Sequence, residues 1–156
     1  MCKQVFNLYC TQVEGAEPGE FFVDRERVSR FYGSYLLTST KTSSAFSLPE
    51  FTSMWSKAVP EGITTCLSHL SGLCIIDDTK PEAPLIKHFP ESSLPEAVQE
   101  RLSVLFTARE RWTLEDISPY IKPLTTAKLN VNALLTKYAR TLNIGGAKYF
   151  CAKHGK

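Results

Sequence analysis

Residues 130–152 have the sequence NVNALLTKYARTLNIGGAKYFCA, and their pattern decides the fold class. Apolar residues recur every three or four positions, which predicts an amphipathic helix over 130–142. Gly145 and Gly146 then signal a tight turn, because glycine adopts the backbone conformations that such turns need. The run 148–152 is typical of a strand. We therefore predict a helix that leads through a tight turn into a closing strand.

Two shorter helices are predicted ahead of this segment. The first follows Ser93-Leu94-Pro95-Glu96, a capping box in which serine and glutamate satisfy free amides of the first turn. The second begins at Thr113 and turns the apolar side of residues 117–121 inward. Three small helices finished by a two-stranded hairpin make the winged-helix plan. We therefore expect residues 91–156 to form a winged-helix domain.

Residues 21–90 show the same order of elements. Asp24 is placed to cap a helix that runs to about Leu37, and the box Ser47-Leu48-Pro49-Glu50 begins another. The remaining predicted elements are a short helix at 64–71 and strands at 73–76 and 85–88. The fold class that we expect is α+β, mainly α-helical with short β-hairpins, arranged as two tandem winged-helix domains.

The first helix of residues 21–90 is bounded by sequence that breaks helices. Residues 14–20 are acidic and contain glycine and proline, so we treat residues 1–20 as an N-terminal extension or linker. The polar run 38–44 follows the helix. Between these breaks one apolar stripe is expected to face the core, formed by Val28, Phe31, Tyr35 and Leu36.

Charge is divided unevenly along the chain of 156 residues, whose formal net charge is +2. Residues 1–94 contain 8 basic and 11 acidic side chains, whereas residues 95–156 contain 10 basic and 5 acidic ones. From Lys122 onward there are 7 basic residues and no acidic residue. Such a segment is suited to a polyanion or to an acidic protein surface.

The last predicted helix and hairpin supply a candidate DNA-binding surface. Lysine and arginine contact phosphates, while asparagine and threonine bond to phosphates or base edges. The candidate DNA-binding residues are Lys128, Asn132, Thr136, Lys137, Arg140, Lys148 and Lys153. Two alternatives stay open. One is an ordinary solvated helix surface, and the other is a purely protein-binding adaptor whose basic face docks on an acidic partner.

The first predicted domain has a different surface. Its predicted wing carries Asp77, Asp78 and Glu82, which would repel a phosphate backbone, so we interpret this domain as protein-facing or structural. The arginines of residues 25–30 could reach phosphates, but acids lie among them, so a solvated helix surface is favoured over that alternative. For the second domain, phosphate contacts are favoured over readout of bases.

The sequence contains no motif for catalysis or for metal binding. Cys66 and His69 are an isolated pair, whereas a closed zinc site needs four ligands. No glycine-rich phosphate loop is present. Five cysteines without a regular framework indicate free thiols in a reducing compartment, and no apolar run reaches the ~20 residues of a membrane span. Trp55 and Trp112 are assigned to the core, with base stacking as the alternative. We expect a protein that is not an enzyme and uses no cofactor.

Two stretches resemble a known family. Residues 109–121, RERWTLEDISPYI, and residues 133–140, ALLTKYAR, closely resemble the C-terminal region of the sister chromatid cohesion protein Dcc family. Residues 51–62, FTSMWSKAVPEG, resemble the domain that precedes it in that family. The resemblance covers most of residues 21–150.

The resemblance implies a tail of winged-helix domains that binds single- and double-stranded DNA and docks onto DNA polymerase epsilon. It implies membership of an alternative replication factor C clamp loader, which acts in the nucleus in DNA replication and cohesion, with the ATPase in other subunits. Family members have a further N-terminal half that joins the clamp-loader partners, and one more winged helix. We therefore expect this chain to be a fragment, a truncated gene model or a short isoform.

Overall fold

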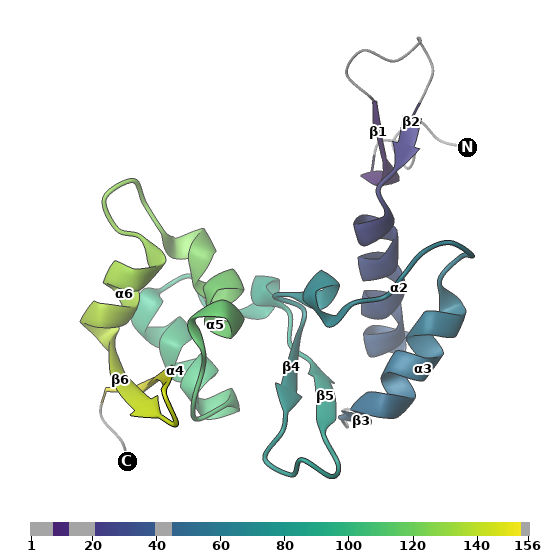
Figure 1. The fold of residues 1–156 in the computed structure, drawn as a ribbon. Coiled ribbons are helices and arrows are strands. Elements are labelled where there is room, and N and C mark those ends of the chain that lie inside the picture. The colour runs from purple at the N-terminus through teal and green to yellow at the C-terminus, as the bar shows by residue number, and fades with distance from the viewer. Residues whose placement is uncertain (1–7, 13–20, 40–44, 154–156) are drawn as a thin grey trace. The chain divides into compact units, whose positions relative to one another are not determined.

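The chain folds into two compact units, Met1–His88 (unit 1) and Phe89–Lys156 (unit 2). The computed structural model describes residues 8–12, 21–39 and 45–153 (Figure 1). Helices and short antiparallel sheets occur together, so the predicted α+β class is confirmed. The predicted break at 14–20 lies outside the described residues, as does most of the predicted break at 38–44, whose first two residues, Thr38 and Ser39, still belong to the helix Arg25–Ser39.

Unit 1 contains helices and two small sheets. Its elements are β1 (Cys10–Gln12), β2 (Phe21–Val23), α2 (Arg25–Ser39), β3 (Phe46–Ser47), α3 (Leu48–Ala58), the 3-10 helix η1 (Leu67–Leu70), β4 (Cys74–Asp77) and β5 (Leu85–His88). β1 pairs with β2, and β3, β5 and β4 form an antiparallel sheet in that order. The strands predicted at 73–76 and 85–88 are confirmed as β4 and β5. β1, β2 and β3 were not predicted, because strands of two or three residues are too short to show alternation.

The buried side of α2 differs from the predicted stripe. The buried residues of this helix are Ser29, Gly33 and Leu37. Phe31 and Tyr35, which were expected to face the core, are 50% and 61% exposed. Gly33 explains the difference: a Cβ added there would lie 2.6 Å from Leu70 and 2.9 Å from Trp55. The missing side chain lets the helix approach the core closely, and this approach decides which side is buried.

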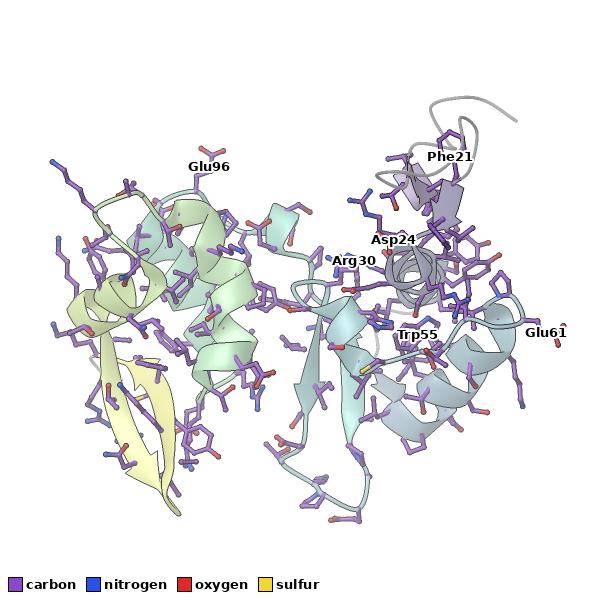
Figure 2. All side chains as sticks on the ribbon, turned by 45° about the horizontal axis from the view of Figure 1, so that its top comes forward. Phe21, Asp24, Arg30, Trp55, Glu61 and Glu96 are labelled. Atoms are coloured by element: carbon purple, nitrogen blue, oxygen red, sulfur yellow. The ribbon has the colours of Figure 1, made fainter. Side chains whose placement is uncertain are left out.

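Hydrogen bonds around Trp55 connect α2 with η1 in the core of unit 1. The indole of Trp55 is 1% exposed and points toward α2, where it donates to the Ser29 carbonyl at 2.8 Å (Figure 2). The Ser29 hydroxyl lies 2.9 Å from Nδ1 of His69. Arg30 donates to the carbonyls of His69 and Ser71, both at 2.8 Å. These bonds hold η1 in place, although it is a single short turn.

Two predicted helical features of unit 1 are wrong. The helix predicted at 64–71 is only the 3-10 turn η1, because Cys66 is extended (φ −141°, ψ 138°) and follows two β-branched threonines. Ser47 precedes α3 as predicted, but its side chain makes no cap hydrogen bond. Ser47 is instead part of β3, where it pairs with Leu85. At the start of α2, by contrast, Asp24 accepts from the Arg27 amide at 3.0 Å, as expected of a cap.

Unit 2 contains three α-helices and one hairpin among its described residues. Its elements are the 3-10 helix η2 (Glu91–Ser93), α4 (Val98–Ala108), α5 (Leu114–Ile121), the 3-10 helix η3 (Lys122–Leu124), α6 (Val131–Tyr138), β6 (Ala139–Ile144) and β7 (Ala147–Ala152). The start of α5 is as predicted, since the Thr113 hydroxyl accepts from the Asp116 amide at 3.1 Å. The predicted inward residues 117, 120 and 121 are buried.

The second predicted capping box, at 93–96, does not begin a helix. Its serine hydroxyl donates to the Pro90 carbonyl at 2.8 Å, and Glu96 extends outward into solvent (Figure 2). The buried side chain of Arg101 donates to the Pro95 carbonyl at 2.6 Å. Because the Pro95 carbonyl accepts from this guanidinium, it does not accept from a backbone amide of a helix, and α4 begins only after the box.

Candidate nucleic-acid interface

The last helix is shorter than predicted. α6 ends at Tyr138, and β6 continues directly from it (Figure 1). Gly145 and Gly146 both have positive φ, 58° and 82°, as in the two-residue turns that connect paired strands. This turn pairs residues 139–144 with residues 147–152. Arg140 therefore lies on β6 and not on the helix.

The start and the exposed side of α6 follow the sequence prediction. The Asn130 side chain accepts from the Ala133 amide at 2.9 Å and caps the helix. Leu134 and Leu135 are buried. The candidate residues Asn132, Thr136 and Lys137 are exposed. The Thr136 hydroxyl donates to the Asn132 carbonyl at 2.8 Å, so it makes a bond within its own helix.

Three candidate lysines have contacts within unit 2. Lys153 Nζ donates to the Lys137 carbonyl at 3.0 Å, at the C-terminal end of α6, where helix carbonyls lack partners. Lys137 Nζ lies 5.1 Å from the centre of the Tyr138 ring. Lys148 Nζ lies 5.2 Å from the centre of the Phe150 ring. All three side chains are still exposed, so their charges stay at the surface.

The candidate residues are not all on one face. Arg140 pairs with Cys151, and Lys148 pairs with Asn143. Paired residues share a face and successive residues alternate, so Arg140 and Lys148 lie on opposite faces of the hairpin. Lys128 is exposed in the loop before α6. The structure brings Lys137 and Lys153 together and separates Lys148 from Arg140.

The hairpin is fixed to the core of unit 2 through Trp112. Trp112 and Phe150 exchange both backbone hydrogen bonds, at 2.9 and 2.8 Å. The indole of Trp112 is 1% exposed and donates to the Arg109 carbonyl at 2.8 Å. The predicted core position of Trp112 is therefore confirmed. The contact with Phe150 had no signal in the sequence, because it joins an isolated residue to a distant strand.

The surface charge of residues 122–153 is of one sign. This segment contains six basic and no acidic residues. Three acids elsewhere in unit 2 form ion pairs outside this segment, Glu91 with Arg101, Asp116 with Arg109 and Glu110 with Arg111. Positive charge on α6 and the hairpin is thus not neutralised by acids of the same segment.

The described residues contain no metal-binding cluster, and two of their cysteines have shifted pKa values. No group of three or more His, Cys, Asp or Glu side chains within them is placed to hold a metal ion. In the predicted isolated pair, Cys66 accepts from the Ser68 hydroxyl at 3.1 Å, and that hydrogen bond lowers the pKa of the Cys66 thiol. Burial raises the pKa of Cys74 to about 11. No helix in the described part of the chain is long and apolar enough to cross a membrane.

Comparisons with known proteins point to one family. A family model described as sister chromatid cohesion protein Dcc1 matches residues 1–121. The chain is similar to sister chromatid cohesion protein DCC1 of Mus musculus, with 40% identity over 131 residues, 83% of this chain and 32% of the relative. It is similar to DCC1 of Homo sapiens, with 38% identity over 146 residues, 92% of this chain and 36% of the relative. The Saccharomyces cerevisiae protein is 26% identical over 148 residues, 90% of this chain and 37% of the relative. The chain thus spans about a third of the length of these relatives.

Proposed function

The chain belongs to the sister chromatid cohesion protein Dcc1 family, and on that premise we propose that it is a DNA-binding adaptor in replication and sister chromatid cohesion. It has no catalytic role and no cofactor. It acts in the nucleus as part of an alternative replication factor C clamp loader, through contacts to DNA and to DNA polymerase epsilon. Both units are winged-helix domains in this proposal, and unit 2 binds the DNA.

The order of elements in unit 2 supports the winged-helix assignment. α4, α5 and α6 are followed at once by the β6–β7 hairpin, and Trp112 adds a single bridge beside Phe150. In helix-turn-helix relatives the last helix enters the major groove and the wing lies beside it. α6 has eight residues, of which Asn132, Thr136 and Lys137 are exposed, so its solvent side suits phosphate contacts better than a long base-reading surface.

The observation that carries the DNA-binding proposal is the exposed positive charge of residues 122–153 without an acid among them. A surface of this kind releases counterions from a phosphate backbone, and this release drives sequence-independent binding. Lys128, Lys137, Arg140 and Lys153 are the cations of the proposed contact. Lys148 joins them only if the tip of the hairpin enters a groove, because its face of the hairpin is opposite to that of Arg140.

A second candidate is a purely protein-binding adaptor, and the lysine contacts favour it. Lys153 caps the end of α6, and Lys137 and Lys148 lie against aromatic rings. Cations with such contacts have structural roles even where no phosphate is bound. In this alternative the same basic face docks on an acidic partner, and the polymerase remains the proposed partner.

Salt titration separates the two candidates. We expect the chain to bind a fluorescent 30-base-pair duplex with micromolar or weaker affinity, by anisotropy, at several salt concentrations. Four phosphate contacts give a slope of about −3.6 in log affinity against log salt, and a fifth contact by Lys148 gives about −4.5. A labelled single strand of the same length shows which strand form is preferred. Absence of binding to both at 50 mM salt would leave the protein-binding candidate.

Matched variants assign the contact to residues. Lys137→Ala with Arg140→Ala should weaken binding and reduce the slope by about 1.8. Lys57→Ala with Lys87→Ala, two exposed lysines of unit 1, removes the same charge and should leave the slope unchanged. Equal effects of the two pairs would mean that overall charge, not this surface, governs binding. Lys148→Ala alone should reduce the slope by about 0.9 only when the hairpin tip enters a groove.

A further inference from the structure

Unit 1 has a groove at the N-terminal end of α3 that the DNA-binding proposal does not use. Its volume is about 530 Å³, and it is lined by Phe46, Pro49, Glu50, Ser53 and Met54. The lining residues on α3 recur at spacings of three and four, so they form one stripe along the helix. This stripe lies on the side away from the buried residues Phe51 and Trp55. α3 therefore has a core side and a second, outward side, on which Pro49 and Met54 are apolar and Glu50 and Ser53 are polar.

The floor of the groove is held by contacts with the core. The rings of Phe46 and the fully buried Phe51 are 6.1 Å apart. Phe46 also pairs with Ile86 of β5, and the Leu48 amide donates to the Pro84 carbonyl at 2.9 Å. Met54 is 42% exposed, although methionine is usually buried. A preformed apolar surface with an exposed, adaptable methionine is typical of a protein-docking site.

The surroundings of the groove are acidic. Glu50 is the one charged residue in its lining. The Leu48–Pro84 bond places the turn between β4 and β5 next to the start of α3 (Figure 1). The exposed charged residues of residues 77–84 are Asp77, Asp78, Lys80 and Glu82. The groove has one acid in its lining, and the neighbouring turn carries three acids and one base, so this part of unit 1 favours a cationic partner and repels phosphate.

We propose that this groove docks a basic segment of another protein, one that presents an apolar side chain beside a lysine or arginine. The apolar side chain lies on Phe46 and Met54, and the cation pairs with Glu50 at the rim. Recognition of an apolar anchor flanked by charge follows the general plan of peptide grooves. The inference stands apart from DNA binding, because it concerns unit 1 and a surface of opposite charge.

Peptide titration of the ¹⁵N-labelled full chain tests this proposal. The probe is a synthetic peptide of sequence LKKLLKKLLKKL, and its control has glutamate at every lysine position. We expect the lysine peptide to shift amides of residues 46–54 and 77–84 and the glutamate peptide to shift none. Glu50→Lys should weaken binding about fivefold or more at 50 mM salt, because it replaces attraction with repulsion. Met54→Gln should also weaken it, because it removes apolar contact.

The matched control is Glu61→Lys, the same charge reversal beyond the other end of α3, where the side chain extends into solvent (Figure 2). It should leave peptide affinity within a factor of two. Equal weakening by Glu50→Lys and Glu61→Lys, or shifts outside the groove only, would overturn the proposal. Concentration-dependent shifts of residues 46–54 without peptide would also overturn it, because a second copy would then be the occupant. Unchanged dispersion of the spectra shows that each variant is folded.

Discussion

The guanidinium of Arg101 donates to the backbone carbonyl of Tyr120 at 2.8 Å, although the arginine residue is only 4% exposed. The same group also donates to the carbonyls of Leu94 and Pro95 and forms an ion pair with Glu91. One cation from α4 thereby holds the segment in front of its own helix and the end of α5. Buried arginine is tolerated here because its donors reach several acceptors.

Removal of this cation should destabilise unit 2. Arg101→Met leaves the buried carbonyls without their donor, and we expect a loss of about 3 kcal/mol in the free energy of unfolding. Trp112 fluorescence in a Trp55→Phe background reports urea unfolding of unit 2 alone, since each unit has one tryptophan. The control Arg111→Met removes an exposed arginine and should cost less than about 1 kcal/mol. Similar losses for both variants would contradict this role of Arg101.

Addition of one methyl group at Gly33 should destabilise unit 1. The Cβ of Gly33→Ala would meet the Leu70 and Trp55 side chains at 2.6 and 2.9 Å, so the core must shift at a cost of about 1–3 kcal/mol. This loss outweighs the helix propensity that alanine gains over glycine, about 1 kcal/mol. Trp55 fluorescence in a Trp112→Phe background gives the measurement. Ser34→Ala, which adds no atom to the same helix, is the control, and a stabilised Gly33→Ala protein would show that α2 is not packed closely here.

The hairpin turn should discriminate between substitutions at Gly145. Asparagine adopts positive φ readily, whereas a β-branched residue does so at a cost of about 1–2 kcal/mol. We therefore expect Gly145→Asn to be nearly neutral and Gly145→Val to lower the stability of unit 2. Urea unfolding followed by Trp112 fluorescence compares the two variants directly. A Cβ added at Gly145 would have no atom within 4 Å, so a steric clash would not account for a difference between the two variants. Equal stability would contradict the turn conformation.

The two cysteines with shifted pKa values should differ in reactivity. Cys66 is exposed, and hydrogen bonds from Ser68 lower its pKa, so more of it is thiolate at pH 7.5 than in a free thiol. Cys74 is half-buried with a pKa of about 11, so it stays protonated until strongly alkaline pH. Alkylation followed by peptide mass spectrometry should label Cys66 first. Ser68→Ala should slow that labelling at pH 7.5, whereas an unchanged rate would mean that exposure alone governs it.

Local signals in the sequence predicted the helix starts at which a side chain caps the backbone. Asp24 and Thr113 each precede a helix and accept from an amide of its first turn. Asn130 does the same, although periodicity and not a cap predicted the helix that follows it. Each signal is contained within four residues, so no distant contact is needed to interpret it. At 47–50 the helix begins as predicted, but Ser47 makes no cap hydrogen bond and pairs with β5 instead. At 93–96 no helix begins, because the distant Arg101 binds the carbonyls of Leu94 and Pro95.

Periodicity was less reliable where two patterns coincide. Leu142 continues the helical stripe of α6, but it also fits the alternation of a strand that ends at the Gly145-Gly146 turn. The turn decides the outcome, because paired strands need residues on both sides of it. In α2 the apolar stripe gave the wrong buried side, since close approach at Gly33 depends on Trp55, which is distant in the sequence.

For the candidate site, the sequence predicted exposure but not contacts. All seven candidate residues are exposed, as charge and polarity indicate. The hydrogen bond from Lys153 to the Lys137 carbonyl and the opposite faces of Arg140 and Lys148 depend on strand register, which charge patterns do not encode. DNA binding by these residues remains a prediction.

The paired hydrogen bonds between Trp112 and Phe150 have a consequence for proteolysis. A protease that cleaves after Tyr149 would remove the partner of a fully buried tryptophan, and water would gain access to the interior beneath α5. The final strand is therefore not a dispensable tail, and trimming it back should convert a folded unit into one that degrades quickly.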